Sequence, residues 1–402
     1  MEELSQTFDA VFQREKGRIV GALVRMLGNI DAAEEAFQEA VLAAIPTWRA
    51  GGVPANPAAW LTTAAKNHAR DAARHRSIVA KNAPLLVERD TVTPETFDTI
   101  ADDELRLIFT CCHPALTLDS QVALTLKVVA GFTTEEIARA FLCPEKTIAQ
   151  RITRAKKTIE EERLPYEVPE GAELPERLAS VLAVVYLMFN EGHTPRQGPL
   201  MRLDLQEASL RLGRALCDLL PNEPEVFGLY ALMAFGFARV ATRGDAEAGL
   251  LLLSEQDRAR WDRPMIKEGL MALQRARRLG GRGSYLLQAE IAACHTTAEQ
   301  WETTDWSRIL GWYDELLGLT GSPVVALNRT VAVAMHDGPA EALAALAELE
   351  APLASYHLFY AIRADFRRRL GQDAREDYRR ALELAGNESE RVFLRRRIDE
   401  AS

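Results

Sequence analysis

The segment Gly131–Glu162 constrains this chain most, because it predicts two short helices joined by a tight turn, with basic side chains on the second helix. Thr133 or Thr134 can cap the first helix, and Glu136 stands at capping-box spacing from Thr133. The dipeptide Cys143-Pro144 ends that helix, because proline lacks an amide donor and suits the first turn of a new helix. The segment is therefore typical of a helix-turn-helix.

The second helix of this segment has an apolar side and a polar side. Its buried stripe is expected to consist of Ile148, Ile152, Ala155 and Ile159. The polar side chains are of the types that bind base edges and phosphates in a major groove. We expect base-edge contacts from Lys146, Gln150 and Arg151, and phosphate contacts from Thr147, Arg154 and Lys157. The alternative is a solvated charged helix on an ordinary bundle, which carries the same pattern.

The overall charge does not exclude DNA binding. The 402 residues carry a formal net charge of −10, with a pI near 5.4, whereas a domain devoted to nucleic acid is often basic as a whole. Phosphate contacts act over a Debye length of about 8 Å at physiological salt, so a basic helix can work on a chain whose remainder is acidic. The acidic remainder also lowers non-specific binding to DNA.

The cysteines and the hydropathy pattern predict a soluble protein of the reducing cytoplasm. Five cysteines without paired spacing do not make a disulfide framework. The first residues mix acidic side chains with hydrophobic ones, unlike a signal peptide, and no later stretch approaches the roughly 18 uninterrupted apolar residues of a membrane span. We therefore expect no contact with a membrane.

Catalytic and metal-binding patterns are weak. Cys111-Cys112-His113 lacks CxxC spacing, and adjacent helical residues point about 100° apart, so we expect core packing there rather than a metal site. No HExxH, GxSxG or phosphate-binding glycine loop occurs. An all-α hydrolase that uses His113 or His193 is a poorly supported alternative. We expect no enzyme activity, no catalytic residue, no metal and no other cofactor.

Helical periodicity runs through the whole chain. We predict an all-α fold, because no alternating run of β-branched residues stands between turn signals. Stretches rich in proline and glycine divide the chain into two small helical modules and a larger helical domain. The predicted boundaries are 1–77 for the first module, 78–101 for a linker, 102–164 for the helix-turn-helix module, 165–175 for a second linker and 176–402 for the larger domain.

The larger domain contains helix pairs whose spacing is similar to that of tetratricopeptide repeats (TPR). The expected pairs are Tyr356–Leu370 with Asp373–Ala385, Val324–Met335 with Pro339–Leu349, and Glu225–Thr242 with Ala246–Leu253. Because the pairs are degenerate and irregularly spaced, a packed helical array without regular repeats is the alternative. Helical arrays with grooves bind peptides or helices.

The first module combines an acidic helix with a basic helix. Residues 31–48 set acidic side chains at helical spacing, and residues 57–76 place lysine and arginine on one side of a second helix. A loop rich in glycine and proline, between Trp48 and Trp60, separates the two. The order along the chain is therefore an acidic helix, a basic helix, a linker and a helix-turn-helix.

This order resembles the extracytoplasmic-function (ECF) group of bacterial RNA polymerase sigma factors, whose minimal architecture is region two, a linker and region four. The segment DAAEEAFQEAVLAA resembles the region-two segment that binds the polymerase clamp helices. WLTTAAKNHARDAARH resembles the segment that engages the minus-ten element, and TTEEIARAFLCPEKTIAQRITRAKK resembles the reader of the minus-thirty-five element. The segments YLMFNEGH, LNRTVAVAMHDGP and LGQDAREDYRRALELAGNESER resemble the ECF subgroup with a long, TPR-like C-terminal extension.

The resemblance implies two partners, core RNA polymerase and promoter DNA. The expected polymerase contacts are Asp31, Glu34, Glu35, Gln38, Glu39 and Leu42. The expected minus-ten contacts are Lys66, Asn67, Arg70 and Arg74, with Asn56 in the preceding loop. Ala36 stands where the family usually has leucine or valine, which weakens the transfer of single residues.

The larger domain is expected to regulate the sigma modules or to bind a protein partner. One alternative is a helix-turn-helix transcriptional regulator with a helical effector domain, which would not bind core polymerase. A second alternative is a helical scaffold with no role on DNA. Association with core polymerase distinguishes the sigma factor from both.

Overall fold

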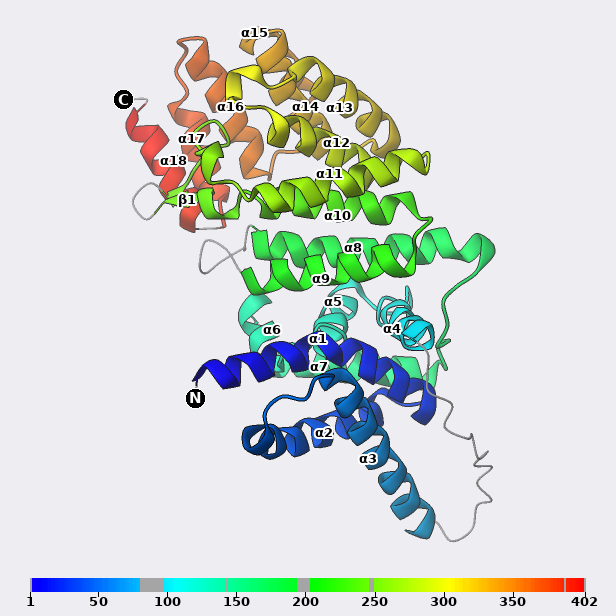
Figure 1. The fold of residues 1–402 in the computed structure, drawn as a ribbon. Coiled ribbons are helices and arrows are strands. Elements are labelled where there is room, and N and C mark those ends of the chain that lie inside the picture. Colours follow the sequence, from blue (N-terminus) through cyan, green and yellow to red (C-terminus); the bar gives the residue numbers. More distant parts are fainter. Residues whose placement is uncertain are drawn as a thin grey trace. The chain divides into compact units, whose positions relative to one another are not determined.

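The structure is a computed structural model that describes residues 2–79, 97–141, 143–193, 203–245, 249–386 and 388–400. The predicted all-α fold is confirmed. Within the described residues, the only strands are β1 (Gly244–Asp245) and β2 (Gly249–Leu250), which have two residues each and pair antiparallel. The chain forms two compact units, Met1–Leu187 and Met188–Ser402, and most of their elements are labelled in Figure 1.

An aromatic cluster holds the first three helices together. These helices are α1 (Glu2–Leu27), α2 (Ile30–Gly51) and α3 (Pro57–Val79). Trp48 of α2 is fully buried and stacks on Phe12 of α1 with 5.4 Å between ring centroids. Trp60 of α3 meets Trp48 edge-on at 5.6 Å. Both tryptophans therefore help to anchor this three-helix core, as burial of large aromatic rings would favour.

The predicted break between the first two helical segments is present, and glycine and proline residues form its two ends. Gly52, at φ +82°, donates its amide to the Trp48 carbonyl and ends α2. Pro57 occupies the first position of α3, where its missing amide leaves no helix bond unmade. The Asn56 side chain accepts a hydrogen bond from the Ala59 amide at 3.0 Å and so caps α3.

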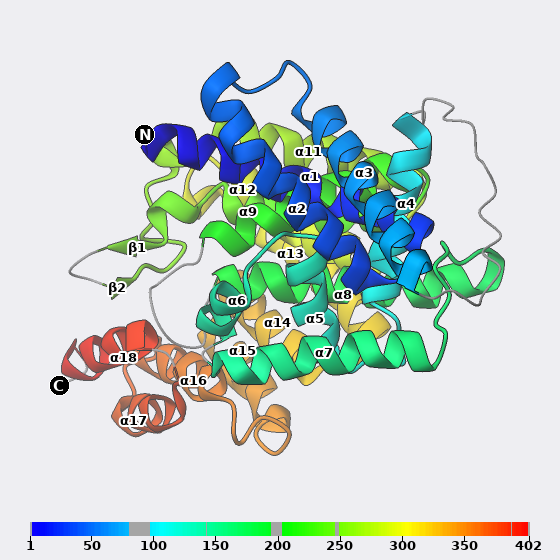
Figure 2. The same cartoon turned by 90° about the horizontal axis from the view of Figure 1, so that it is seen from below.

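The helix-turn-helix forms as the sequence predicts. The four helices that follow residue 96 are α4 (Phe97–Cys111), α5 (Leu118–Val128), α6 (Thr134–Phe141) and α7 (Glu145–Glu161). The Thr133 hydroxyl accepts from the Glu136 amide at 3.1 Å, and the Glu136 carboxylate accepts from the Thr133 amide at 2.7 Å. This capping box starts α6, and α7 packs on α5 and α6 (Figure 2). Residues 80–96 of the predicted linker lie outside the described residues.

Beyond α8 (Leu174–His193), the second unit is a succession of helices, most of which pack on the next helix in the sequence. The helices are α9 (Leu203–Leu219), α10 (Pro224–Phe237), α11 (Arg263–Arg278), α12 (Ser284–Thr297), α13 (Trp306–Thr320), α14 (Pro323–His336), α15 (Pro339–Leu346), α16 (His357–Arg369), α17 (Arg375–Leu384) and α18 (Glu388–Glu400). One 3₁₀ turn, Gly171–Glu173, precedes α8 in the first unit. The second unit has 3₁₀ turns at Val240–Thr242, Arg258–Arg260, Trp301–Thr303 and Ala347–Leu349.

Two of the three predicted helix pairs are present. Gly338 (φ +117°) makes the turn between α14 and α15, and Gly371 (φ +68°) follows α16 before α17. The third pair was predicted wrongly, because Ala246–Leu253 does not form a second helix. Gly249 and Leu250 instead pair with β1, and residues 246–248 lie outside the described residues. Gly244 and Gly249, one in each strand, disfavour a helix here, since glycine costs helix propensity and allows close backbone approach.

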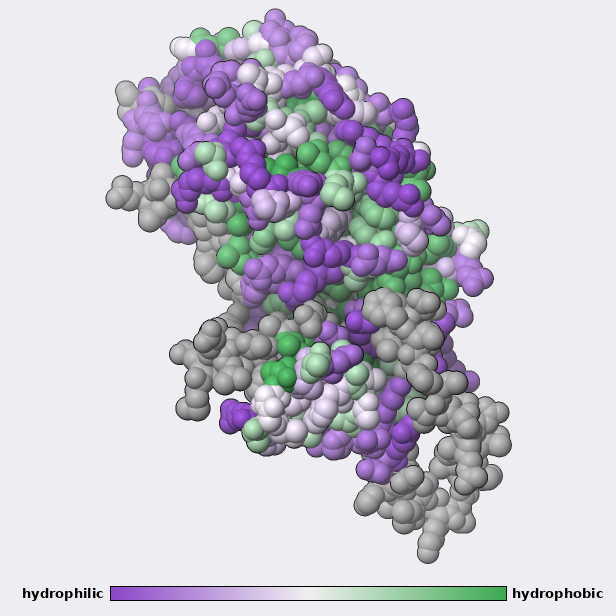
Figure 3. Space-filling model, viewed as in Figure 1, coloured by the Kyte–Doolittle hydropathy of each residue, from purple (hydrophilic) through white to green (hydrophobic). Residues whose placement is uncertain are grey.

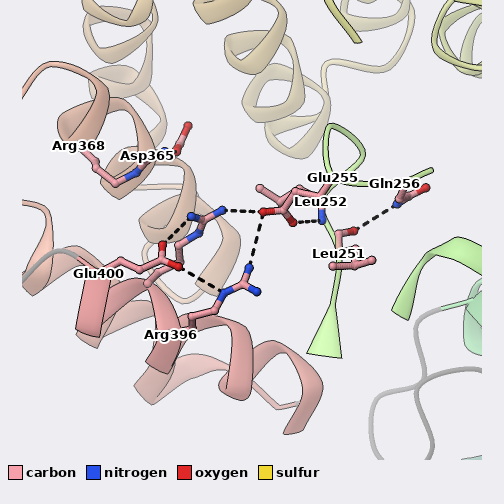
Figure 4. A network of polar contacts seen from close by, with 9 residues as sticks. Leu251, Leu252, Glu255, Gln256, Asp365, Arg368, Arg396 and Glu400 are labelled. Atoms are coloured by element: carbon pink, nitrogen blue, oxygen red, sulfur yellow. Dashed lines mark hydrogen bonds and ion pairs between the residues drawn. The ribbon is translucent and has the colours of Figure 1, made fainter. Parts of the chain in front are cut away.

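The last helix is tied to the hairpin region. Glu255, a few residues after β2, accepts from the Leu252 amide at 2.8 Å and from Arg397 of α18 at 3.4 Å. Arg396 of α18 lies 3.7 Å from the same carboxylate oxygen of Glu255. Figure 4 shows this network, in which Glu255 joins a local turn to the C-terminal helix.

The stretch Pro224–Thr242, which contains α10, is long and apolar enough to cross a membrane by length and composition alone, but most of it is buried. Met233, Ala234 and Phe235 on this stretch have no exposed surface. Hydrophilic residues cover much of the face of the second unit drawn in Figure 3. The apolar stretch is therefore accounted for as a core element of this unit.

Candidate polymerase and DNA interfaces

One side of α2 carries exposed acidic side chains. Asn29 caps this helix by accepting from the Ala32 amide at 2.9 Å. Five of the six predicted polymerase contacts are exposed and recur at helical spacing, so they share one side. We call them the acidic ridge: Asp31, Glu35, Gln38, Glu39 and Leu42. Leu42 is 60% exposed and adds an apolar contact to the ridge.

Glu34, the sixth predicted polymerase contact, is buried. Its side chain is 7% exposed, and its two oxygens accept from Lys16 at 2.8 Å and from Lys156 at 2.7 Å. Burial acts to raise the pKa of Glu34, but the two ammonium groups outweigh burial, and the pKa is lowered. Glu34 therefore lies beside the acidic ridge as an ionised group that already has two cationic partners.

Three of the predicted minus-ten contacts lie together on α3. Asn67 and Arg70 are exposed and Lys66 is half-buried, and their spacing places them on neighbouring positions of the helix surface. Arg74 belongs to the same helix, but its side chain lies outside the described residues. Asn56 is exposed at the start of α3, about 15 Å along the helix axis from Lys66 at 1.5 Å per residue. The structure thus separates Asn56 from the other three.

The outward side of α7 carries the predicted minus-thirty-five contacts. Ile148, Ile152 and Ala155 are buried on the opposite side. Four of the predicted contacts are exposed, namely Lys146, Gln150, Arg154 and Lys157, and two are half-buried, namely Thr147 and Arg151. The structure therefore brings all six to one helix, in the arrangement that a major groove can accept.

Two lysines that sequence reasoning missed contact the α2 carboxylates. Lys156 of α7 binds Asp31 as well as Glu34, and Lys16 of α1 binds Glu34. Lys156 follows the buried Ala155 and lies four residues after Ile152, so it flanks the apolar stripe. The position of Lys156 beside the apolar stripe could therefore have indicated, from the sequence alone, that its side chain is partly buried. Lys16 lies in a polar stretch, and the sequence gives no such indication for it.

The Cys111-Cys112-His113 segment packs as part of the core. Both thiols are fully buried, and burial raises the pKa of Cys112 to about 12. The His113 ring accepts from the Ala115 amide at 3.1 Å and so supports the turn that follows α4. Among the residues that the structure describes, no group of three or more His, Cys, Asp or Glu side chains could hold a metal ion. The His193 side chain lies outside them.

Comparisons with known proteins match both small modules. Sigma-70 region 2 matches residues 11–78, and sigma-70 region 4 matches residues 106–159. RNA polymerase sigma factor CarQ of Myxococcus xanthus is 33% identical over 131 residues, which are 32% of this chain and 74% of CarQ. The chain belongs to the sigma-70 family. The ECF RNA polymerase sigma-E factor of Haemophilus influenzae is 26% identical to this sigma factor over 171 residues, 40% of this chain and 89% of that protein. The sigma regions of this chain are therefore of the ECF-like type.

The C-terminal part of this sigma factor also has relatives. Residues 177–277 match a family of unknown function, DUF6596. An uncharacterized protein of Rhizobium meliloti is 41% identical over 401 residues, which are 97% of this chain and 95% of that protein. The similarity extends over both compact units of this chain.

Proposed function

We propose that this ECF-type sigma factor binds core RNA polymerase in the cytoplasm and directs transcription from promoters with minus-ten and minus-thirty-five elements. We assign residues 1–77 to region two, 102–164 to region four and 176–402 to the C-terminal extension. One observation carries the proposal: an exposed acidic ridge on α2 and an exposed basic side on α7 lie in the segments that match regions two and four. A transcriptional regulator that binds DNA alone has no use for the ridge.

The acidic ridge supplies the polymerase contact. Exposed carboxylates on a rigid helix attract basic side chains on a partner helix and accelerate encounter. Asp31, Glu35 and Glu39 provide the charges, Gln38 can donate and accept, and Leu42 adds apolar area at the end of the ridge. Glu34 joins this set once its two lysine partners release it.

Region two and region four divide the promoter between them. On α3, Lys66, Asn67, Arg70 and Arg74 hold the opened minus-ten strand, and the loop that ends at Asn56 receives an unstacked base. On α7, Lys146, Gln150 and Arg151 bind base edges of the minus-thirty-five element, while Thr147, Arg154 and Lys157 bind phosphates. Most of these side chains are exposed, whereas Lys66, Thr147 and Arg151 are half-buried and the Arg74 side chain is not among those described.

In vitro transcription tests the function directly. Purified core polymerase with this protein is expected to give transcripts that start downstream of a selected promoter, with DNA protected at both elements. Core polymerase without the protein is the control. Binding to the same DNA with no co-purification of core polymerase would instead support the DNA-binding regulator, and the proposed sigma function would be wrong.

The C-terminal extension is proposed to act as a built-in regulator in place of a separate anti-sigma protein. A truncation that tests this role has to leave the first unit intact. The Tyr166 hydroxyl donates to the Gly21 carbonyl at 2.7 Å, and Arg177 donates to the Phe109 carbonyl at 3.1 Å, so α8 should be kept. A chain that ends after His193 is expected to change transcript amount or promoter choice. Unchanged output, with helix content preserved by circular dichroism, would exclude the regulatory role.

A further inference from the structure

Two arginines and a histidine of the second unit form a cationic cluster. Arg239 follows α10, Arg258 begins the 3₁₀ turn Arg258–Arg260, and His295 lies near the end of α12, which packs on α10 (Figure 1). All three side chains are half-buried. Among the residues that the structure describes, neither arginine has an aspartate or glutamate within ion-pair distance. The cluster therefore lacks the counter-charge that usually accompanies arginine in a partly buried place.

Hydrogen bonds fix the turn that precedes Trp261 against the end of α10. The Asp262 amide donates to the Ala238 carbonyl at 2.9 Å. The Trp261 indole donates to the Thr242 hydroxyl at 3.0 Å, and that hydroxyl donates to the Arg239 carbonyl at 2.9 Å. The backbone that carries the two arginines is therefore rigidly positioned, as a binding site requires.

Part of the donor capacity of the cluster is unused. Arg258 Nη1 donates to the carbonyls of His295 and Ala298, both at 2.7 Å. Its Nη2 and the Nδ1 of His295 are buried and have no hydrogen-bond partner among the described residues. The guanidinium of Arg239 donates from Nε to the Phe235 carbonyl of α10 at 3.4 Å. Because an unpaired buried donor destabilises a fold, these nitrogens indicate a site for a molecule that accepts hydrogen bonds.

The charges of the cluster show that this molecule is an anion. Burial, and then the charge of Arg258, lower the pKa of Arg239 to about 10. Burial lowers the pKa of His295 to about 3, and both arginines act in the same direction. Burial also lowers the pKa of Arg258, a shift that the exposed Glu302 opposes. Both guanidinium groups remain charged at neutral pH, so an anion between them would relieve their repulsion.

We propose that Arg239, Arg258 and His295 form a binding site for a phosphate dianion, either free or carried as a monoester by a small molecule. The two guanidinium charges match the charge of a phosphate group at pH 7, about −1.5 to −2. Guanidinium groups are planar and present paired N–H donors that fit phosphate oxygens. The neutral His295 ring donates through Nδ1 in the tautomer that carries its proton there. The site lies within the second unit and does not depend on the sigma function proposed above.

Isothermal titration calorimetry of the full-length protein with inorganic phosphate is the first test. We expect saturable binding of phosphate and no binding of chloride at the same ionic strength. Glycerol 3-phosphate is the second probe. Tighter binding of this monoester than of inorganic phosphate would assign the site to phosphorylated small molecules, and weaker binding would assign it to free phosphate. Absence of saturable binding of both probes would overturn the inference.

Arg239→Gln distinguishes a binding role of this residue from a structural one. The variant is expected to weaken phosphate binding by about tenfold or more, because a charged donor is lost. In phosphate-free buffer its melting temperature is expected to rise by about 2–4 °C, because repulsion between the two arginines is removed. Arg278→Gln removes an equal charge from an exposed position on α11 and is expected to change neither quantity.

The opposite results for Arg239→Gln would overturn the inference. Phosphate affinity equal to that of the wild type would show that Arg239 does not bind the anion. A lower melting temperature without phosphate would show that its charge stabilises the fold. If the variant does not fold, calorimetry on the wild-type protein still decides whether phosphate binds.

Discussion

Arg151 of α7 and Asp119 of α5 form an ion pair, with 3.0 Å between Nη2 and Oδ2. The side chain of Arg151 is 33% exposed and that of Asp119 is 65% exposed. The pair joins the proposed DNA-binding helix α7 to α5. Because exposed ion pairs contribute only about 0–1 kcal/mol to stability, substitutions here are expected to change DNA binding far more than folding.

Arg151→Ala is expected to reduce discrimination between correct and altered minus-thirty-five elements by about 1–3 kcal/mol, because a lost base contact removes sequence preference. Competition binding with promoter variants measures this change. Asp119→Asn keeps a hydrogen-bond acceptor beside Arg151 and serves as the control, with discrimination largely retained. If Arg151→Ala discriminates as well as the wild type, Arg151 does not bind a base edge.

Arg154 is predicted to act on phosphates and not on bases. Arg154→Ala is expected to weaken binding to all duplexes alike and to lower the slope of log K against log salt concentration by about one unit, since one counterion fewer is released. Binding isotherms at several salt concentrations give the slope. Lys267→Ala, in the second unit, should leave it unchanged. A change in sequence preference with an unaltered slope would contradict the assignment of Arg154.

The helix-turn-helix could be predicted because its signals are local. The Thr133 capping box, the proline at position 144 and the buried stripe through Ile148 and Ile152 all lie within one segment and all act through helix geometry. The acidic helix α2 was likewise predicted from the local spacing of its side chains. Where propensity, capping and periodicity agree, the sequence specifies the element.

The ion pairs of Lys16 and Lys156 with the carboxylates of α2 could not be predicted, because they depend on contacts between positions far apart in the chain. Lys156 and Asp31 are separated by 125 positions, and no periodicity records which charged residue of a helix meets another helix. The hairpin at Gly244 and Gly249 was missed for a related reason. Its two-residue strands are too short for an alternating pattern, and the docking of α18 on this region is a long-range contact.

Gly21→Ala is predicted to destabilise the first unit. An added Cβ would lie 2.7 Å from the Asp103 carbonyl oxygen and 2.8 Å from its carbon, and these backbone atoms cannot move without shifting α4. Overpacking typically costs about 1–3 kcal/mol, which outweighs a gain in helix propensity of roughly 1 kcal/mol. Urea unfolding should therefore show a lower midpoint for this unit.

Gly311→Ala is the matched control for Gly21→Ala. Gly311 lies within α13 and an added Cβ would meet nothing within 4 Å. Only the propensity effect remains there, so this variant should be more stable by up to about 1 kcal/mol. An equal gain in stability from both variants would show that α1 and α4 are not closely packed in solution.

Glu104 of α4 introduces a pH dependence into the packing of α1 against α4. An added Cβ on Gly17 of α1 would lie 2.8 Å from its carboxylate. Burial raises the pKa of Glu104 from 4.5 to about 7, the nearby Arg18 acts to lower it, and Glu15 raises it further. The folded protein therefore holds a proton between pH 4.5 and about 7 that the unfolded chain has released.

Stability from this group is present below pH 4.5 and is lost as the pH rises through about 7, because ionisation is then more favourable in the unfolded chain. Glu104→Gln stays neutral at every pH. The variant is expected to match the wild type near pH 4 and to exceed it above pH 8 by up to about 3 kcal/mol in the free energy of unfolding. Glu170→Gln, at an exposed position, should follow the wild type throughout. Stability curves of Glu104→Gln and wild type that run parallel from pH 4 to pH 8 would show that Glu104 is solvated and that α1 and α4 separate readily.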